Sequence, residues 1–198
     1  VCLCVCVSVC LCVCVSVCMC VSLCSLGSSV GKGFPSKLSQ APRSKSCDFK
    51  AHKTTMAAVS NVPREKFMQP GYEVAAFVNR PQPIGHGQTI SQPYIVALMT
   101  DLLDLKGNEK VLEVGSGSGY QAAVLAEILR GGEVYTVEVV PALAGLAKRR
   151  LIKLGYSNVM FKQGDGYQGW SEHAPYDAIV VTAAPERLPN ELIQQLKP

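Results

Sequence analysis

The stretch KVLEVGSGSGYQ (residues 110–121) decides the fold, because it joins a strand pattern to a helix pattern through three alternating glycines. The apolar run before the glycines is typical of a buried strand, and AAVLAEIL after them is typical of a helix. Further helices are predicted at 141–154 and 188–196, and strands at 133–139, 158–162 and 178–182. This alternation predicts an α/β fold with a parallel, doubly wound sheet.

The spacing of the glycines predicts which cofactor the turn binds. Such a turn lets main-chain amides approach a ligand at a helix N-terminus. The dinucleotide pattern G-x-G-x-x-G needs a glycine where this chain has Tyr120. Gly115, Gly117 and Gly119, preceded by Glu113, instead form the E-x-G-x-G-x-G pattern of methyltransferases that use S-adenosylmethionine. The sequence therefore favours a Rossmann-like class I methyltransferase over an NAD enzyme.

Two acidic residues follow later strands at positions where this cofactor needs acceptors. Glu138 ends the next strand, about 20 residues further on, and is expected to accept the ribose hydroxyls. Asp165 follows the third strand and is expected to accept from the adenine amino group. The alternatives are a solvated strand end for Glu138 and a plain Asp-Gly turn for Asp165.

The N-terminal third differs in composition from the rest. Residues 1–24 repeat VCLCVCVS and hold nine of the ten cysteines. A transmembrane helix and a secretory signal are alternative interpretations of this segment. However, a repeat that follows alternating GT codons favours translated simple-sequence DNA. Residues 25–55 are rich in Ser, Lys and Pro and are predicted to be a flexible linker. We expect no part of residues 1–55 to pack stably on the domain. The domain is expected at 56–198.

Charge argues against nucleic acid as a partner. Residues 56–198 hold 13 Lys and Arg against 14 Asp and Glu, so the overall charge of +4 comes from the N-terminal third. Residues 56–198 also lack cysteine, and no metal site is predicted there. We expect a cytoplasmic monomer without a membrane partner.

Several longer motifs resemble the protein-L-isoaspartate O-methyltransferase family. They run from VPREKF through RPQPIGHGQTISQPYIVALMTDLL and VLEVGSGSGYQAAVLAE to LGYSNVMFKQGDGYQGW and APYDAIVVTAA. The resemblance implies methylation of the α-carboxylate of isoaspartyl residues in proteins and peptides, followed by collapse to a succinimide that opens partly to aspartate. Because a carboxylate is already ionised at neutral pH, the reaction needs alignment more than a base.

The resemblance also implies roles for individual residues. Ser91 matches the family's active-site serine, with Gln88, Thr89 and Ile90 in the same pocket; Ser91 also fits an N-cap for the helix that follows. The cofactor positions that match are Glu113, Gly115, Ser116, Gly117, Gly119, Glu138, Asp165 and Gly166. His52, His86 and His173 are given no catalytic role.

Two departures from the family shape further expectations. No helix is recognisable ahead of VPREKF, and the sequence ends at LKP, where the family continues with roughly three more strands. We expect a sheet truncated before its last strands, with strand 178–182 as an exposed edge. The alternatives to the main hypothesis are an inactive fragment of such an enzyme and a methyltransferase with a different substrate.

Overall fold

The computed structural model describes residues 2–7, 11–14, 51–183 and 188–198. Its strands are β1 (Cys2–Val7), β2 (Leu11–Cys14), β3 (Gln82–Gly85), β4 (Gln88–Ile90), β5 (Lys110–Val114), β6 (Glu133–Glu138), β7 (Val159–Gln163) and β8 (Ala178–Val181). Its helices are α1 (Lys53–Asn61), α2 (Pro93–Leu102), α3 (Tyr120–Ile128), α4 (Pro141–Lys153) and α5 (Asn190–Ile193). Single 3-10 turns are η2 (Arg64–Phe67), η3 (Glu73–Ala75), η4 (Gly166–Gln168) and η5 (Ser171–His173).

The main sheet has the strand order β2-β1-β8-β5-β6-β7. The pairs β5 with β6, β6 with β7, β5 with β8 and β1 with β8 are parallel, and only β2 runs antiparallel. The predicted alternation of strands and helices is confirmed, with boundaries that differ by one or two residues except in the last helix, which is only four residues long. Because parallel strands end at the same edge, the loops after β5, β6, β7 and β8 meet there.

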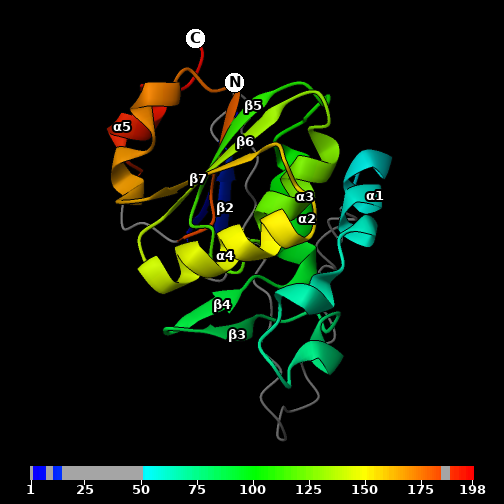
Figure 1. Cartoon of the computed structure of the whole chain (residues 1–198). Coiled ribbons are helices and arrows are strands. Elements are labelled where there is room, and N and C mark those ends of the chain that lie inside the picture. The colour runs from blue at the N-terminus through cyan, green and yellow to red at the C-terminus, as the bar shows by residue number, and fades with distance from the viewer. Residues whose placement is uncertain (1, 8–10, 15–50, 184–187) are drawn as a thin grey trace, which may run out of the picture.

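Both faces of the sheet are covered by apolar side chains, as parallel sheets require. On one face, Val111 and Val134 belong to a core with α1 to α4; on the other, Leu112 and Tyr135 belong to a second core with Leu192 of α5. Figure 1 shows α5 on the opposite side of the strands from α1, α2 and α3. Helix α3 is almost wholly buried between its neighbours, so the turn that begins it has little freedom.

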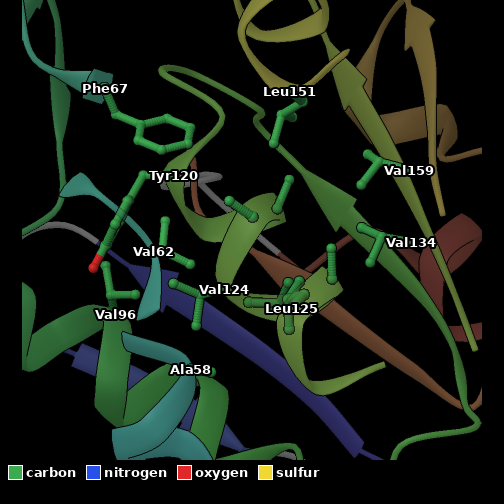
Figure 2. Packing of buried hydrophobic residues seen from close by; sticks show 14 of the residues in the cluster. Ala58, Val62, Phe67, Val96, Tyr120, Val124, Leu125, Val134, Leu151 and Val159 are labelled. Carbon is green, nitrogen blue, oxygen red and sulfur yellow. The ribbon is translucent and has the colours of Figure 1, made fainter. Parts of the chain in front are cut away.

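The core that contains α1 to α4 reaches the glycine turn through the contact of Phe67 with Tyr120. The rings of Phe67 and Tyr120 meet edge to face, with centroids 5.5 Å apart (Figure 2). Tyr120 is the first residue of α3 and is buried, as are Val62 and Val124 beside it. The segment VPREKF therefore packs directly against the start of the helix that follows the turn.

Three expectations about the N-terminal region are wrong. Strand β1 pairs in parallel with β8, from Cys2 opposite Ala178 to Val5 opposite Val181, so β8 is not a free edge and β1 does pack on the domain. An edge of unpaired amides and carbonyls accepts any β-prone segment, and the alternating repeat is one. A helix does precede VPREKF, and it begins at Lys53 rather than after residue 55. Most of the predicted linker, 25–50, lies outside the described residues.

The segment RPQPIGHGQTISQP is not a plain loop. It forms an antiparallel hairpin of β3 and β4, in which Gln82 lies opposite Ile90. The turn contains His86, which has φ of 53°, and Gly87. The hairpin delivers Ser91 to the start of α2.

Candidate functional site

One cavity of about 360 Å³ opens at the carboxyl edge of the sheet. Its walls come from the ends of β5, β6 and β8, the loop after β7, and the segment between β4 and α2. Ten of the predicted site residues line it: Gln88, Thr89, Ile90, Ser91, Gly115, Ser116, Gly117, Glu138, Asp165 and Gly166. Residues that are far apart in the sequence thus face one space, whose size suits a small-molecule ligand.

The three glycines of the turn each have a left-handed backbone. The φ angles are 97° at Gly115, 52° at Gly117 and 89° at Gly119. A Cβ at Gly115 would lie 2.7 Å from Oγ1 of Thr182, and one at Gly119 would lie 3.2 Å from Cδ1 of Leu151. Glycine is therefore favoured by conformation at all three positions, and the contact at Gly115 adds a steric reason. Gly119 does not line the cavity. It is the N-cap of α3 and lies against Leu151 of α4.

Glu138 supports the turn as well as facing the cavity. One carboxylate oxygen accepts from the amide of Gly117 at 2.8 Å, and the other accepts from the amide of Val140 at 3.0 Å. The side chain is buried, with 6% of its surface exposed. Each carboxylate oxygen has a second lone pair, so these bonds leave capacity for a ligand hydroxyl.

Glu113 lies behind the cavity wall rather than in it. Its carboxyl accepts from the hydroxyl of Thr136, whose Oγ1 lies 2.6 Å from Oγ of Ser116. Burial raises the pKa of Glu113 to about 8, and the neighbouring Glu138 adds to this, while the hydrogen bonds from Thr136 and the amide of Ala122 oppose it. Glu113 is therefore largely uncharged at neutral pH and connects to the turn through two hydroxyls.

The hydroxyl of Ser91 has no hydrogen-bond partner among the described residues. The predicted N-cap role is wrong, since Gln92 occupies the N-cap of α2 and Pro93 is the first helical residue. The carbonyl of Ser91 accepts a 2.6 Å hydrogen bond from Arg64. Ser91 lines the cavity.

Asp165 and Gly166 form the wall beyond β7. The Asp165 carboxylate caps η4 by accepting from the amide of Tyr167 at 2.9 Å, so the turn alternative is correct as local structure. Asp165 also lines the cavity. A Cβ at Gly166 would lie 2.5 Å from Cγ1 of Val114, so only glycine lets this loop approach β5.

Sequence reasoning missed several lining residues. Thr182 follows β8 and donates to the carbonyls of Val114 and Gly115 at 2.9 and 2.6 Å. Val139 is 64% exposed and Tyr167 is 39% exposed, and both border the cavity beside a predicted acid. These two could have been found from the sequence, because each lies within two residues of a predicted acid. An acid can bond the edge of a flat ring while a neighbouring apolar side chain contacts its face.

The three histidines lie away from the cavity lining. His52 is not in a linker: it occupies the N-cap of α1, and its Nδ1 lies 3.0 Å from a carboxylate oxygen of Asp101. His173 packs against the rings of Tyr135 and Trp170. In the described ranges no group of His, Cys, Asp and Glu is arranged to hold a metal, and no helix there is long and apolar enough to cross a membrane.

Comparisons with known proteins agree on one family. Residues 41–198 match the family described as protein-L-isoaspartate(D-aspartate) O-methyltransferase (PCMT). A protein-L-isoaspartate O-methyltransferase of Gloeobacter violaceus is 60% identical over 141 residues, which are 71% of this chain and 68% of the relative. A protein-L-isoaspartate O-methyltransferase 2 of a Polaromonas species is 59% identical over 72% of this chain and 66% of the relative. The matched part thus spans about two thirds of these relatives' length.

Solved structures share the fold. A protein-L-isoaspartate O-methyltransferase superposes with a TM-score of 0.69 at 33% identity, covering 74% of this chain and 48% of the other. A structure described as a beta-aspartate methyltransferase (PCMT) of Plasmodium falciparum, in complex with S-adenosyl-L-homocysteine, superposes with a TM-score of 0.64 at 26% identity. It covers 74% of this chain and 72% of the other. The predicted Rossmann-like methyltransferase fold is confirmed.

Proposed function

The chain belongs to the protein-L-isoaspartate(D-aspartate) O-methyltransferase family, and from this premise we propose that it methylates L-isoaspartyl residues in damaged proteins with S-adenosylmethionine as donor. The observation that carries the proposal is that the segment 88–91 and the glycine turn line the same cavity of about 360 Å³. A cofactor on the turn would thereby face a substrate held by the segment.

The cofactor fits the polar groups and apolar surfaces of the cavity. Glu138 would accept the ribose hydroxyls, because its carboxylate is fixed by two amides and lines the cavity. Asp165 would accept from the adenine amino group, with Val139 and Tyr167 against the faces of the ring. The amino-acid tail would lie along Gly115 and Gly117, whose left-handed backbones allow close approach. Glu113 would support this turn from behind through Thr136 and Ser116.

The substrate carboxylate would lie at Ser91. The hydroxyl of this residue has no other partner in the described part of the chain, and a hydroxyl donor to a carboxylate forms a charge-assisted hydrogen bond. Gln88, Thr89 and Ile90 would contact the adjoining substrate atoms. Because the carboxylate is ionised at neutral pH, no side chain has to remove a proton.

The reaction then depends on alignment. An oxygen of the α-carboxylate attacks the methyl carbon attached to the sulfonium, the carbon–sulfur bond breaks, and its electron pair stays on sulfur. The products are the methyl ester and S-adenosylhomocysteine. The ester next loses methanol when the following main-chain nitrogen closes a succinimide, which water opens partly to aspartate. The protein contributes by placing oxygen, carbon and sulfur in line and by excluding water.

The proposed substrates follow from this chemistry. We propose isoaspartyl-containing proteins and peptides as substrates, a monomer as the active unit, and the cytoplasm as location. Nucleic acid is a poor partner for residues 56–198, because acidic residues there outnumber basic ones by one.

Paired peptides test the proposal directly. The chain is incubated with methyl-labelled S-adenosylmethionine and two peptides that differ only in an aspartyl or isoaspartyl linkage. We expect label in the isoaspartyl peptide alone, and the label should be lost on treatment with base, as an ester requires. Equal labelling of both peptides, or none of either, would reject the substrate assignment.

A further inference from the structure

Two arginines next to the cavity have no carboxylate partner among the described residues. Arg64 is fully buried, and Arg150 is half-buried. Within the described part of the chain neither forms an ion pair. Arginines in such places are usually paired, because an isolated buried charge is costly. Both donate to main-chain carbonyls, and each joins segments that are distant in the sequence.

Arg64 joins the segment after α1 to Ser91, which lies two residues before α2. Its Nε donates to the carbonyl of Ala76 at 2.6 Å, and its Nη2 donates to the carbonyl of Ser91 at 2.6 Å. The guanidinium lies over the ring of Tyr120, 4.5 Å from its centroid. Figure 2 shows that ring between Phe67 and Val96. The carbonyl of Ser91 is therefore fixed relative to the first residue of α3.

Arg150 makes the corresponding connection for the cofactor turn. Its Nη1 donates to the carbonyl of Ser118 at 3.2 Å, and its Nη2 donates to the carbonyl of Met68 at 3.0 Å. The two arginines thus tie different walls of one cavity to the segment 64–76. Each wall has its own connection, so each can be loosened separately.

We propose that Arg64 is a positioning residue that holds the segment 88–92 so that the Ser91 hydroxyl faces the reacting carboxylate; this rests on the proposed function. The role requires a planar donor pair. Only arginine offers two fixed N–H directions that reach carbonyls 12 and 27 residues away in sequence at once. Lysine keeps the charge and much of the length but replaces the fork with one ammonium group.

The experiment compares Arg64→Lys and Arg64→Gln with Arg150→Lys in the full chain. Steady-state kinetics with an isoaspartyl peptide give kcat and KM, and calorimetry gives the dissociation constant of S-adenosylmethionine. We expect both Arg64 variants to lose on the order of tenfold in kcat/KM for the peptide, the cost of one charged hydrogen bond, while cofactor affinity stays unchanged. Arg150→Lys should instead lower the affinity for S-adenosylmethionine more than it lowers kcat/KM for the peptide.

Hydrogen exchange gives a second measurement that needs no turnover. Arg64→Lys should speed exchange in peptides that cover 88–92 and leave 115–119 unchanged, and Arg150→Lys should show the opposite pattern. If the unaltered chain methylates no isoaspartyl peptide, the proposed function fails, and exchange still decides the role of Arg64.

Three outcomes would overturn the proposal. Full peptide methylation in Arg64→Lys would show that the charge suffices and the fork is not needed. Parallel loss of cofactor binding and peptide methylation in both Arg64 variants would show a general role in the fold. Faster exchange across both segments in Arg64→Lys would show the same.

Discussion

The carboxylate of Glu138 accepts a 2.8 Å hydrogen bond from the amide of Gly117, which joins the acid at the end of β6 to the middle of the glycine turn. Its other oxygen accepts from Val140, the residue before α4. A residue predicted only as a cofactor ligand is thus also part of the scaffold that shapes the cofactor turn.

Glu138→Ala should weaken S-adenosylmethionine binding and lower thermal stability together. Loss of charge-assisted hydrogen bonds to the ligand predicts a decrease in affinity of roughly tenfold to hundredfold. Loss of the bonds to two amides should in addition lower the melting temperature. Calorimetry and thermal unfolding measure the two effects. Glu133→Gln, at the exposed opposite end of β6, is the control and should leave affinity unchanged. Unaltered affinity in Glu138→Ala would assign the ribose to another residue.

Gly115→Ala should destabilise the chain more than Gly71→Ala does. Both glycines have positive φ, 97° and 87°, so both substitutions carry backbone strain of about 1 to 2 kcal/mol. Only at Gly115 would the new Cβ also meet Oγ1 of Thr182 at 2.7 Å, whereas at Gly71 nothing lies within 4 Å. Overpacking adds roughly 1 to 3 kcal/mol. Chemical denaturation measures the difference, and equal losses would mean that the Thr182 contact relaxes without cost.

Local features of the fold could be predicted from the sequence, because each depends on a few adjacent residues. The strand that ends at Val114, the glycine spacing and the acid at position 138 are of this kind. The N-cap of α2 also had a local signal that was overlooked: Pro93 suits the first helical position, which makes Gln92 the cap and not Ser91.

Contacts between distant segments could not be predicted in this way. The fork of Arg64 reaches carbonyls of Ala76 and Ser91, and carbonyls carry no signature in a sequence. The pairing of β1 with β8 likewise depends on which edge of the sheet is free. Glu138 was found as an acid, but its bond to Gly117 follows only once β5 and β6 are adjacent.

Ser91→Ala should reduce methylation of an isoaspartyl peptide without changing cofactor affinity. The variant removes one hydroxyl donor to the substrate carboxylate, and the expected loss in kcat/KM is on the order of tenfold. Ser60→Ala is a matched control, since that hydroxyl donates to the carbonyl of Met56 on the exposed surface of α1. Full activity in Ser91→Ala would favour the alternative of a different substrate.

Asp101→Asn should loosen α1 from α2. One oxygen of this carboxylate accepts hydrogen bonds from the amide of His52 at 2.7 Å and from the hydroxyl of Thr55 at 2.8 Å. The Nδ1 of His52 lies 3.0 Å from the same oxygen. Hydrogen bonds to a charged group contribute about 1.5 to 3 kcal/mol, against about 0.5 to 1.5 kcal/mol for neutral ones, and asparagine removes the charge. Urea unfolding should show that loss. Asp104→Asn, where the exposed carboxylate pairs with the exposed Lys106, should change stability little. Equal effects of the two variants would contradict a specific role for Asp101.

The buried carboxyl of Glu113 should make the stability of the chain depend on pH. Its pKa is raised from 4.5 to about 8, chiefly by burial. Between these values the folded chain keeps this proton while the unfolded chain releases it, so the unfolded state binds fewer protons. Stability is therefore highest at the acid end of this range and decreases as the pH rises, by at most about 1.4 kcal/mol per pH unit. Above about pH 8 the contribution levels off.

Glu113→Gln isolates this contribution, because every other titrating group is present in both proteins. The amide cannot ionise, so the variant should lack the decrease between pH 5 and pH 8, and its unfolding free energy relative to the parent should rise across that range. Denaturant unfolding at several pH values, without cofactor, measures both curves. If the two curves stay parallel, Glu113 is ionised in the folded chain, and the hydrogen bond from Thr136 together with the amide of Ala122 outweighs its burial.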